Sequence, residues 1–352
     1  MSEDYERAPR LAQVLVGESQ GGAERFFVKL CAALARRGWP QKVIVSPEPR
    51  RVEALRDAGC DVTTLPFRRG VFGRLSRPAL RRALAGFGAE ATHCTLKRAV
   101  AAAPRGPWAL TARLGGYYAV DKYRRCDLLI PNTPDIADWL VREGWPRQRI
   151  ATIPSFEAAP VPPAPPASRP GRPVVLALGR LHPVKGLDTL IRAAARLPEA
   201  ELRIAGDGPL RAELEALAAA EGVTGRVRFL GWRDDAAELL EACDVLAAPS
   251  RREPFGNVVL EAWRARRPLV ACAAEGPRWL IRHGEDGVLV PVDDPPALAE
   301  ALRALLADPA RRAALAEAGA RRLERDFSEE AVCAAYAAAF RRAVALRRGA
   351  AA

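Results

Sequence analysis

The stretch that decides the fold is Arg251-Arg-Glu-Pro-Phe-Gly-Asn257, followed by the apolar run Val258-Val-Leu-Glu-Ala-Trp263. Pro254 and Gly256 interrupt the element before them, and the apolar residues that follow recur at helical spacing. A loop therefore carries Glu253 to the start of a helix. The free N–H groups and partial positive charge of a helix start suit a diphosphate, and Gly256 lets the backbone approach a ligand.

Two carboxylates bracket this helix start. Glu261 lies about one turn inside the helix and can accept hydrogen bonds from vicinal hydroxyls such as those of a ribose, while Glu253 can do the same for a sugar. A solvated loop before a core helix would also place two glutamates in this way. The interpretation therefore depends on the rest of the chain.

Strands and helices alternate on both sides of this stretch. In the second half we expect strands at residues 174–178, 201–205, 227–230, 244–247 and 268–271, and helices at 187–196, 210–220 and 236–242. Glycine loops follow the first two of these strands, at 179–186 and 206–209, and residues 275–277 are expected to form another loop. This alternation predicts a doubly wound parallel sheet, whose ligands bind at the carboxyl ends of the strands.

The first half shows the same alternation. Strands are expected at 11–16, 42–46, 61–65, 90–94, 109–112, 128–131 and 150–153, and helices at 26–34, 51–57, 78–86 and 134–143. The loop at 17–24 is rich in glycine but is not Gly-x-Gly-x-x-Gly, which disfavours an NAD site. Seven prolines between 160 and 173 indicate a stiff linker. We expect α/β domains at 1–165 and 171–328, with a C-terminal helix at 329–352 that packs back on the first domain.

Composition and charge narrow the class of protein. The 352 residues are 49% hydrophobic, but arginines interrupt every apolar run before the ~20 residues that would span a bilayer. The acidic N-terminus does not suit a secretory signal, so we expect a cytoplasmic protein. The seven cysteines are scattered and odd in number, which favours buried thiols over a disulfide framework or a zinc site.

Positive charge is concentrated in the first half. Residues 1–170 hold 27 Lys and Arg against 16 Asp and Glu, whereas the whole chain carries a net charge of +12. The densest cluster mixes basic and apolar residues without a nucleic-acid motif, which favours an anionic membrane surface over nucleic acid as a partner, with a merely solvated arginine-rich face as the alternative. Its arginines are Arg68, Arg69, Arg74, Arg77, Arg81 and Arg82.

Seven short motifs occur in one order along the chain. They are Gly21-Gly-Ala-Glu24, Gly179-Arg180 with Lys185-Gly186, Gly206-Asp-Gly-Pro209, Phe229-Leu-Gly231, Glu253-Pro-Phe-Gly256, Glu261, and a turn containing Gly284 and Gly287. Together they resemble the retaining glycosyltransferases of family 4, which have two Rossmann-like domains facing a cleft (GT-B fold). Residues 117–132 are similar to those of members that build bacterial lipopolysaccharide core or other surface glycans.

The resemblance implies retaining sugar transfer from a nucleotide-diphosphate donor to a glycan or glycolipid acceptor, without a metal or other cofactor. Arg180, Lys185 and Glu253 would be catalytic, with the two cations clamping the diphosphate and Glu253 holding the donor sugar. Glu261 would hold the ribose, and Gly21 and Gly22 would approach the donor from the other domain. The remaining donor-binding positions are Gly179, Gly206, Leu230, Phe255, Gly256, Asn257 and Val258.

Two observations independent of the resemblance favour this site. Lys185 is the only lysine after residue 122 in a chain that otherwise uses arginine, which is consistent with a need for a compact ammonium group. Asn257 is one of only two asparagines.

The acceptor side is less defined. Many relatives have a histidine after the strand that ends near Ala112, and this chain has Arg113, which cannot act as a base at neutral pH. Either the leaving phosphate deprotonates the acceptor or His93 contributes, although His93 also fits a core position. Arg113 is then better suited to an anionic acceptor group. The alternative function is a nucleotide-sugar epimerase of the same fold, which would not require the basic first half.

Overall fold

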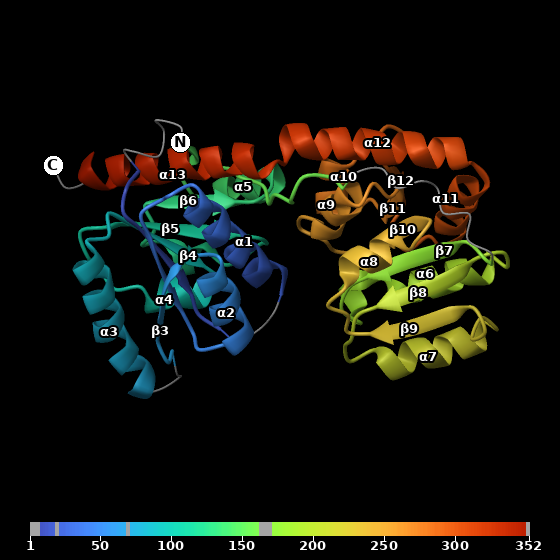
Figure 1. Ribbon diagram of the computed structural model, residues 1–352, viewed down its shortest axis with the longest axis horizontal. Coiled ribbons are helices and arrows are strands. Elements are labelled where there is room, and N and C mark those ends of the chain that lie inside the picture. Colours follow the sequence, from blue (N-terminus) through green and yellow to red (C-terminus); the bar gives the residue numbers. More distant parts are fainter. Residues whose placement is uncertain (1–7, 18–20, 68–70, 162–170, 350–352) are drawn as a thin grey trace. The chain divides into compact units, whose positions relative to one another are not determined.

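The computed structural model describes residues 8–17, 21–67, 71–161 and 171–349, without the side chains of 71–75. The chain divides into two compact units (Figure 1). The first unit comprises residues 1–155 together with 329–352, and the second comprises 156–328. Each unit is a parallel α/β sheet with helices packed against it.

The first unit contains six parallel strands in the order β3-β2-β1-β4-β5-β6. They are β1 (Leu11–Leu15), β2 (Gln41–Val45), β3 (Asp61–Thr64), β4 (Ala91–Thr95), β5 (Ala109–Leu114) and β6 (Leu128–Pro131). Every residue of β1, β4, β5 and β6 is buried, as expected for parallel strands covered on both faces.

Helices from both ends of the chain cover this sheet. They are α1 (Gly22–Arg36), α2 (Pro49–Asp57), α3 (Val71–Phe87), α4 (Lys97–Ala102), α5 (Pro134–Arg142) and the C-terminal α13 (Glu329–Gly349), with short 3-10 turns at Val120–Tyr123 and Arg147–Arg149. Helix α13 buries Tyr336 and Phe340 against α1, β4 and β5. Glu329 at its start accepts hydrogen bonds from Arg36 and Arg37 of the α1 end, each at 2.6 Å.

The second unit repeats the design with the strand order β12-β11-β10-β7-β8-β9. Its strands are β7 (Val174–Leu178), β8 (Glu201–Ala205), β9 (Val227–Gly231), β10 (Val245–Ala248), β11 (Leu269–Cys272) and β12 (Val288–Val290). Its helices are α6 (Leu187–Ala195), α7 (Arg211–Ala220), α8 (Ala236–Glu241), α9 (Asn257–Arg264), α10 (Glu275–Leu280), α11 (Pro295–Ala307) and α12 (Pro309–Asp326), with a 3-10 turn at Pro183–Lys185.

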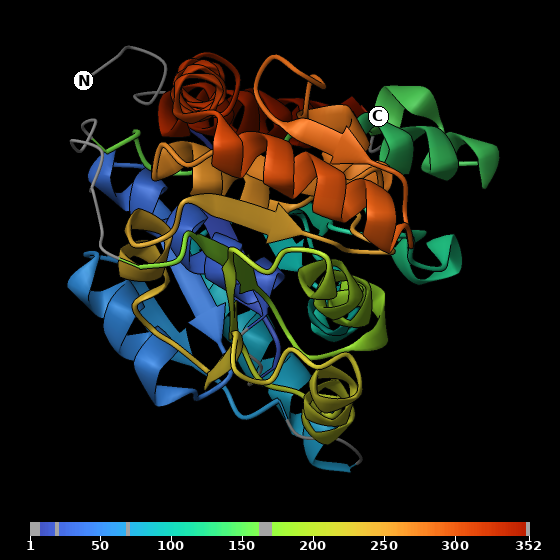
Figure 2. The ribbon, with the colours of Figure 1, turned by 90° about the vertical axis from the view of Figure 1, so that its right-hand side faces the viewer.

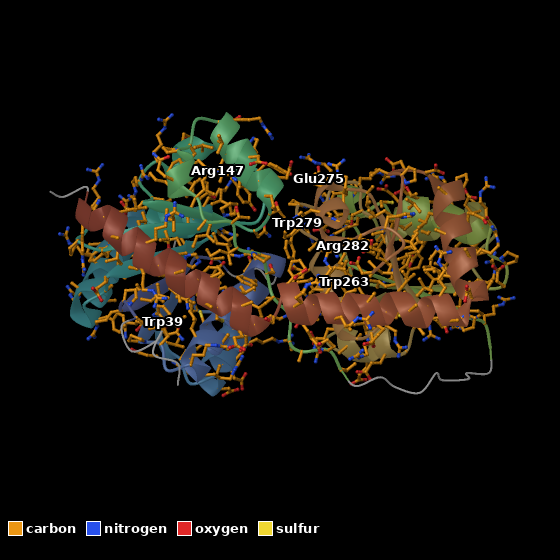
Figure 3. All side chains as sticks on the ribbon, turned by 90° about the horizontal axis from the view of Figure 1, so that it is seen from above. Trp39, Arg147, Trp263, Glu275, Trp279 and Arg282 are labelled. Carbon is orange, nitrogen blue, oxygen red and sulfur yellow. The ribbon has the colours of Figure 1, made fainter. Side chains whose placement is uncertain are left out.

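Two groups of helices pack in the second unit. Helix α6 lies between α7 and α11 (Figure 2). Helix α12 packs on α9, where the Trp263 indole fills the space left by Gly319 and donates to the Asp286 carbonyl at 2.8 Å (Figure 3). A Cβ on residue 319 would lie 2.1 Å from that indole, so only glycine allows this packing.

The structure corrects three of the expectations. Residues 150–153 are not a full strand, although Ala151 and Ile153 each donate a backbone hydrogen bond to β6 at 2.9 Å and Ile150 forms a bridge to Leu129. Pro154 follows at once and cannot continue the ladder. Residues 275–277 begin α10 instead of forming a loop, since a proline is tolerated in a first helical turn. The boundary between the units lies at 155/156, ahead of the proline-rich stretch, because Val161 hydrogen-bonds to Arg264 and Arg266 of the second unit.

Candidate functional site

The strand order of the second unit defines where a ligand would bind. Strand β7 lies between β10 and β8. The chain adds β8 and β9 on one side of β7 and then crosses over to add β10, β11 and β12 on the other side. Ligands of open parallel sheets bind at such a switch point, outside the carboxyl ends of the strands. The loop after β7 carries Lys185, and the loop after β10 carries Glu253. The two loops that the sequence analysis selected are therefore neighbours at the switch point.

Lys185 and Glu253 form an ion pair across these two loops. Their side chains are 24% and 16% exposed, so the pair is sheltered but open to solvent on one side. The Lys185 ammonium group can turn from Glu253 to an incoming phosphate. The released Glu253 carboxylate can then bind solvent or sugar hydroxyls, so the exchange of partners costs little free energy. The pair brings together two of the three residues predicted to be catalytic.

The Lys185 loop is held close to the β10 loop. Gly186 adopts a left-handed conformation with φ of 60°, and a Cβ at this position would lie 2.1 Å from the Pro249 carbonyl oxygen. The N–H of Arg251 donates to the Val184 carbonyl oxygen at 2.9 Å. Only glycine at 186 allows the two backbones to approach so closely.

The Arg251 guanidinium adds a second connection between the same loops. It donates to both carboxylate oxygens of Asp188 at 2.7 Å and to the Pro183 carbonyl oxygen at 2.9 Å. It also contacts Asp293, after β12, at 2.6 Å. Burial alone would raise the pKa of Asp188, but the hydrogen bonds and charge of Arg251 outweigh burial and hold that pKa below its usual value. We call Arg251, Asp188 and Asp293 the Arg251 cluster.

The turn that carries Glu253 is anchored by α10. The N–H of Glu253 donates to the Glu275 carboxylate at 3.2 Å, and the N–H of Gly276 donates to the Glu253 carbonyl oxygen at 2.8 Å. Phe255 is buried, and its ring lies 6.0 Å from the ring of Trp279, which belongs to α10 with Glu275 (Figure 3). The Phe255 side chain thus fixes the turn from inside, and its predicted place in the donor site stays a prediction.

The predicted helix start follows this turn. Gly256 precedes α9 with φ of 102°, and no side chain caps the N-terminal N–H groups of the helix. Asn257 and Val258 form its first turn and are half-buried, as is Glu261 one turn later. The helix therefore begins directly after Gly256, where the sequence predicted its start.

The remaining predicted donor positions lie at the ends of β7, β8 and β9. Gly179 donates its N–H to the Ala205 carbonyl oxygen, and Gly206 donates to the Gly231 carbonyl oxygen next to the half-buried Leu230. A Cβ on residue 206 would lie 1.9 Å from the Gly179 carbonyl oxygen, so the two loops require this glycine. Arg180 is exposed, and in the described residues its side chain joins no ion pair with the Lys185 site.

In the first unit, Gly21 and Gly22 start α1. Gly21 precedes the helix and accepts the Arg25 N–H at 3.0 Å, and Gly22 is its first residue. Residues 18–20 of the same loop lie outside the described residues. Arg113 lies near the carboxyl end of β5 and is almost fully buried.

His93 does not occupy the position of an acceptor base. Its side chain is completely buried in β4 beneath α13, with the rings of Tyr336 and Phe340 at 5.7 and 5.3 Å. Nδ1 contacts the Thr111 hydroxyl at 2.9 Å, and Nε2 has no described partner. Burial, assisted by the charge of Arg113, lowers the pKa of His93 to about 3. The alternative of a core histidine fits this environment, and the structure does not support a role for His93 in acceptor chemistry.

This buried histidine has a consequence for acid stability. Its pKa is lower in the folded than in the unfolded protein, so the unfolded chain binds the extra proton first, and stability is lost as the pH falls below about 6.5. Between pH 7 and pH 5 the loss should be about 2 kcal/mol. We expect His93→Gln to remove most of this dependence, as measured by urea unfolding at both pH values. An equal slope in the variant and the wild type would contradict the prediction.

Several residues of this site were not found from the sequence. Arg251 and Glu253 belong to the stretch that the sequence predicted to form the site, but Asp188, Asp293 and Glu275 were not predicted to belong to it. Their only signal was a position after a strand or at a helix start, which many surface residues share. The seven cysteines are all buried and free, as the sequence predicted.

Comparisons with known proteins agree with this geometry. Residues 172–308 match the family model described as glycosyl transferases group 1, and residues 21–155 match the model described as glycosyl transferase 4-like domain. Together the two models cover most of both units.

Relatives extend along nearly the whole chain. It is 38% identical over 333 residues to the lipopolysaccharide core biosynthesis glycosyltransferase LpsE of Rhizobium meliloti, covering 90% of this chain and 94% of the relative. It is 37% identical to LpsD of the same organism, covering 94% and 97%. The solved structure of Anabaena HepE in complex with UDP and glucose has a TM-score of 0.79 at 21% identity, covering 92% of this chain and 97% of that chain.

The two family models and the two long relatives show the family, and the strand order of each unit shows the fold. The chain belongs to the group 1 glycosyl transferase family and has the two parallel α/β units of the GT-B fold.

Proposed function

We propose that this glycosyltransferase moves a sugar from a nucleotide-diphosphate donor to a glycan or glycolipid acceptor, with retention of configuration, in the biosynthesis of a bacterial lipopolysaccharide or related surface glycan. The observation that carries the proposal is the Lys185–Glu253 ion pair at the switch point of the second unit. The names of LpsE and LpsD support the pathway, and the UDP bound to HepE supports the class of donor.

The reaction requires stabilisation of a leaving diphosphate. Lys185 supplies a positive charge next to the phosphates, and the uncapped N-terminus of α9 supplies N–H donors and a partial positive charge. Arg180, on the same loop as Lys185, is a further cation for this role. When Lys185 turns to the phosphate, Glu253 is released to hold hydroxyls of the donor sugar, and Glu261 holds the ribose.

Retention and independence from metal are parts of the proposal. In the proposed mechanism the leaving phosphate oxygen takes the proton of the acceptor hydroxyl on the face from which it departs, because Arg113 cannot act as a base and His93 is enclosed in the core. Cations and a helix terminus can neutralise the diphosphate in place of a metal. Activity that persists in excess EDTA and a product of unchanged anomeric configuration, read by NMR coupling constants, would support both parts. A metal requirement or an inverted product would contradict the corresponding part.

The test of the function uses a panel of UDP- and GDP-sugars with and without a lipopolysaccharide core acceptor. We expect release of nucleoside diphosphate that depends on acceptor. Conversion of the donor sugar without acceptor would instead support the epimerase alternative. Lack of either reaction with every pair would leave the proposed pathway unsupported and direct the search to other surface glycans.

We also propose that the basic face of the first unit binds an anionic membrane surface. Arg77, Arg81 and Arg82 are exposed on α3. Arg68 and Arg69 lie outside the described residues, as does the side chain of Arg74. Across the described residues, no helix combines the length and the apolar content needed to cross a bilayer.

Reversal of charge on this face should weaken membrane binding. The triple change of Arg74, Arg77 and Arg81 to Glu is expected to lower partition onto vesicles of anionic lipid at least tenfold, because each basic residue near such a surface contributes about 1 kcal/mol. Vesicle sedimentation at physiological salt measures the effect.

A control with the same change of charge uses Arg228, Arg282 and Arg321, which are exposed in the second unit. Its binding should stay within threefold of the wild type. Equal loss in both triple variants would indicate a response to net charge alone, and undiminished binding of the α3 variant would remove the membrane proposal.

A further inference from the structure

The first unit contains a buried cation that no described carboxylate neutralises. The side chain of Arg113 is 5% exposed. Its Nη2 donates to the Ser155 hydroxyl at 2.8 Å, and its guanidinium lies 4.1 Å from the centroid of the Phe26 ring. Nε is enclosed without a partner. Among the residues that the structure describes, no Asp or Glu reaches Arg113 at ion-pair distance.

The charge of Arg113 affects the pKa values of the groups around it. It contributes to the lowered pKa of His93, and it opposes the effect of burial, which raises the pKa of Tyr118. The Glu24 carboxylate acts on the pKa of Tyr118 in the opposite direction and raises it. A buried guanidinium that lacks a direct counter-charge lowers the stability of the free protein. Such a cost is retained where the charge serves a ligand.

Two side-chain nitrogens lie close to Gly115. A Cβ on this half-buried residue would lie 3.3 Å from Arg113 Nη1 and 3.7 Å from Asn132 Nδ2. Among the described residues, Arg113 Nη2 is the guanidinium nitrogen that donates to Ser155, and the guanidinium also interacts with the Tyr336 hydroxyl of α13, where it opposes the rise in pKa that burial causes. Arg113 lies near the end of β5, and Asn132 directly follows β6, its neighbour in the sheet. Two donors from adjacent strands thus converge on the face of Gly115, which has no side chain to cover them.

We propose that this face binds an anionic group of the acceptor, a carboxylate or a phosphate on the glycan, held by Arg113 Nη1 and Asn132 Nδ2 over Gly115. The inference rests on the proposed function and deepens it, because it assigns a chemical class to the acceptor. A planar guanidinium matches the geometry of both oxyanions, whereas a neutral sugar would leave the charge unpaired.

A purely structural role for Arg113 makes a different prediction about stability. If the Ser155 and Phe26 contacts are the purpose of Arg113, then Arg113→Met should lower the melting temperature by several degrees. If the charge is kept for a ligand, replacing it with an apolar chain of similar length should leave the melting temperature of the free protein unchanged or raised. Melting curves without ligand distinguish the two roles.

The binding test uses three simple probes at matched ionic strength, titrated by calorimetry. They are glucuronate for a carboxylate, glucose 6-phosphate for a phosphate, and glucose as the neutral sugar. We expect at least one anionic probe to bind tenfold or more tightly than glucose, and the preferred probe identifies which anion the acceptor carries. Arg113→Met should abolish this preference, and Arg142→Met, which removes an exposed arginine of α5, should keep it.

A second variant keeps the charge and covers the two donors. Gly115→Ala places a methyl group between the two donors and should weaken the preferred anion at least fivefold without loss of Arg113. Equal binding of all three probes, or a preference that survives both Arg113→Met and Gly115→Ala, would overturn the anion site.

Failure of this inference can be separated from failure of the proposed function. Binding of UDP and GDP is measured on the same variants, and the Lys185 site lies in the second unit. Acceptor-dependent release of nucleoside diphosphate with no preference for anionic probes would overturn the anion site alone. Absence of nucleotide binding and of transfer would overturn the proposed function.

Discussion

Lys185→Ala is expected to reduce turnover about a thousandfold or more while both units remain folded. The ammonium group of Lys185 lies at the switch point of the second unit, where its ion pair with Glu253 holds it in the wild type. Without it, negative charge on the leaving diphosphate loses its nearest cation in a sheltered site. A thousandfold loss corresponds to about 4 kcal/mol of transition-state stabilisation.

Rates of nucleoside diphosphate release, with melting temperatures alongside, measure this effect. The matched control is Lys122→Ala, since Lys122 is an exposed lysine of the first unit that pairs with its neighbour Asp121. Its activity should equal that of the wild type. Lys185→Arg should recover less than a tenth of the activity, because a planar fork does not replace a compact ammonium group. Turnover within tenfold of the wild type in Lys185→Ala would exclude this lysine from the chemistry.

The parallel architecture could be predicted because buried parallel strands appear as short continuous apolar runs. Strand β7, Val174–Leu178, was predicted at its full length, and its residues are buried or nearly so. The same rule gave a wrong strand at 150–153, where an apolar run precedes Pro154. Strand β12 was missed because three residues show no pattern. Local sequence therefore identifies a strand only when it is long enough and free to pair on the sheet.

The residues of the candidate site could be predicted from the sequence, but the contacts between them could not. Lys185 and Glu253 were both assigned from their loops, with separate roles for phosphate and sugar. Their ion pair depends on β7 and β10 being neighbours, which is a property of the strand order and not of either loop. The surroundings of His93 could not be predicted from its own segment, because α13, from the far end of the chain, covers the strand that carries it.

The strand order also explains why the Arg251 cluster matters for catalysis. Loops after parallel strands lie outside the sheet ladder, so few hydrogen bonds fix their relative position, and here side chains add to the backbone contact between residues 184 and 251. Arg251 joins the loop that carries Glu253 to the start of α6 and to the carbonyl oxygen of Pro183, two residues before Lys185. We therefore expect Arg251 to act as a positioning residue, through Lys185 and not on the substrate.

Arg251→Met is expected to lower kcat about a hundredfold, with a smaller change in KM for the donor. The loop after β7 would keep its backbone hydrogen bond to residue 251 but lose the bidentate contact to Asp188, so Lys185 would no longer be held against the diphosphate. A hundredfold loss corresponds to about 2.7 kcal/mol. Steady-state kinetics with one donor and one acceptor measure kcat and KM separately.

The control uses a second arginine that binds the same carboxylate. Arg192 donates to Asp188 at 3.1 Å from within α6, but it does not reach the β10 loop. Arg192→Met should therefore keep kcat within twofold of the wild type, although it removes the same charge and a contact to the same partner. Equal losses in the two variants would show that the charge of Asp188 matters, and not the connection between the loops.

A charge exchange gives the sharpest test of the connection. The exchange is made in an Asp293→Asn background, which removes the second carboxylate that contacts Arg251. There the double variant Arg251→Asp with Asp188→Arg restores a pair of opposite charges between the loop and α6, whereas each single change leaves two like charges facing each other. We expect the double variant to recover at least tenfold over either single variant, as interacting residues do in double-mutant cycles. Additive losses would mean that Arg251 and Asp188 act independently, because residues that act through their mutual contact must respond to its restoration.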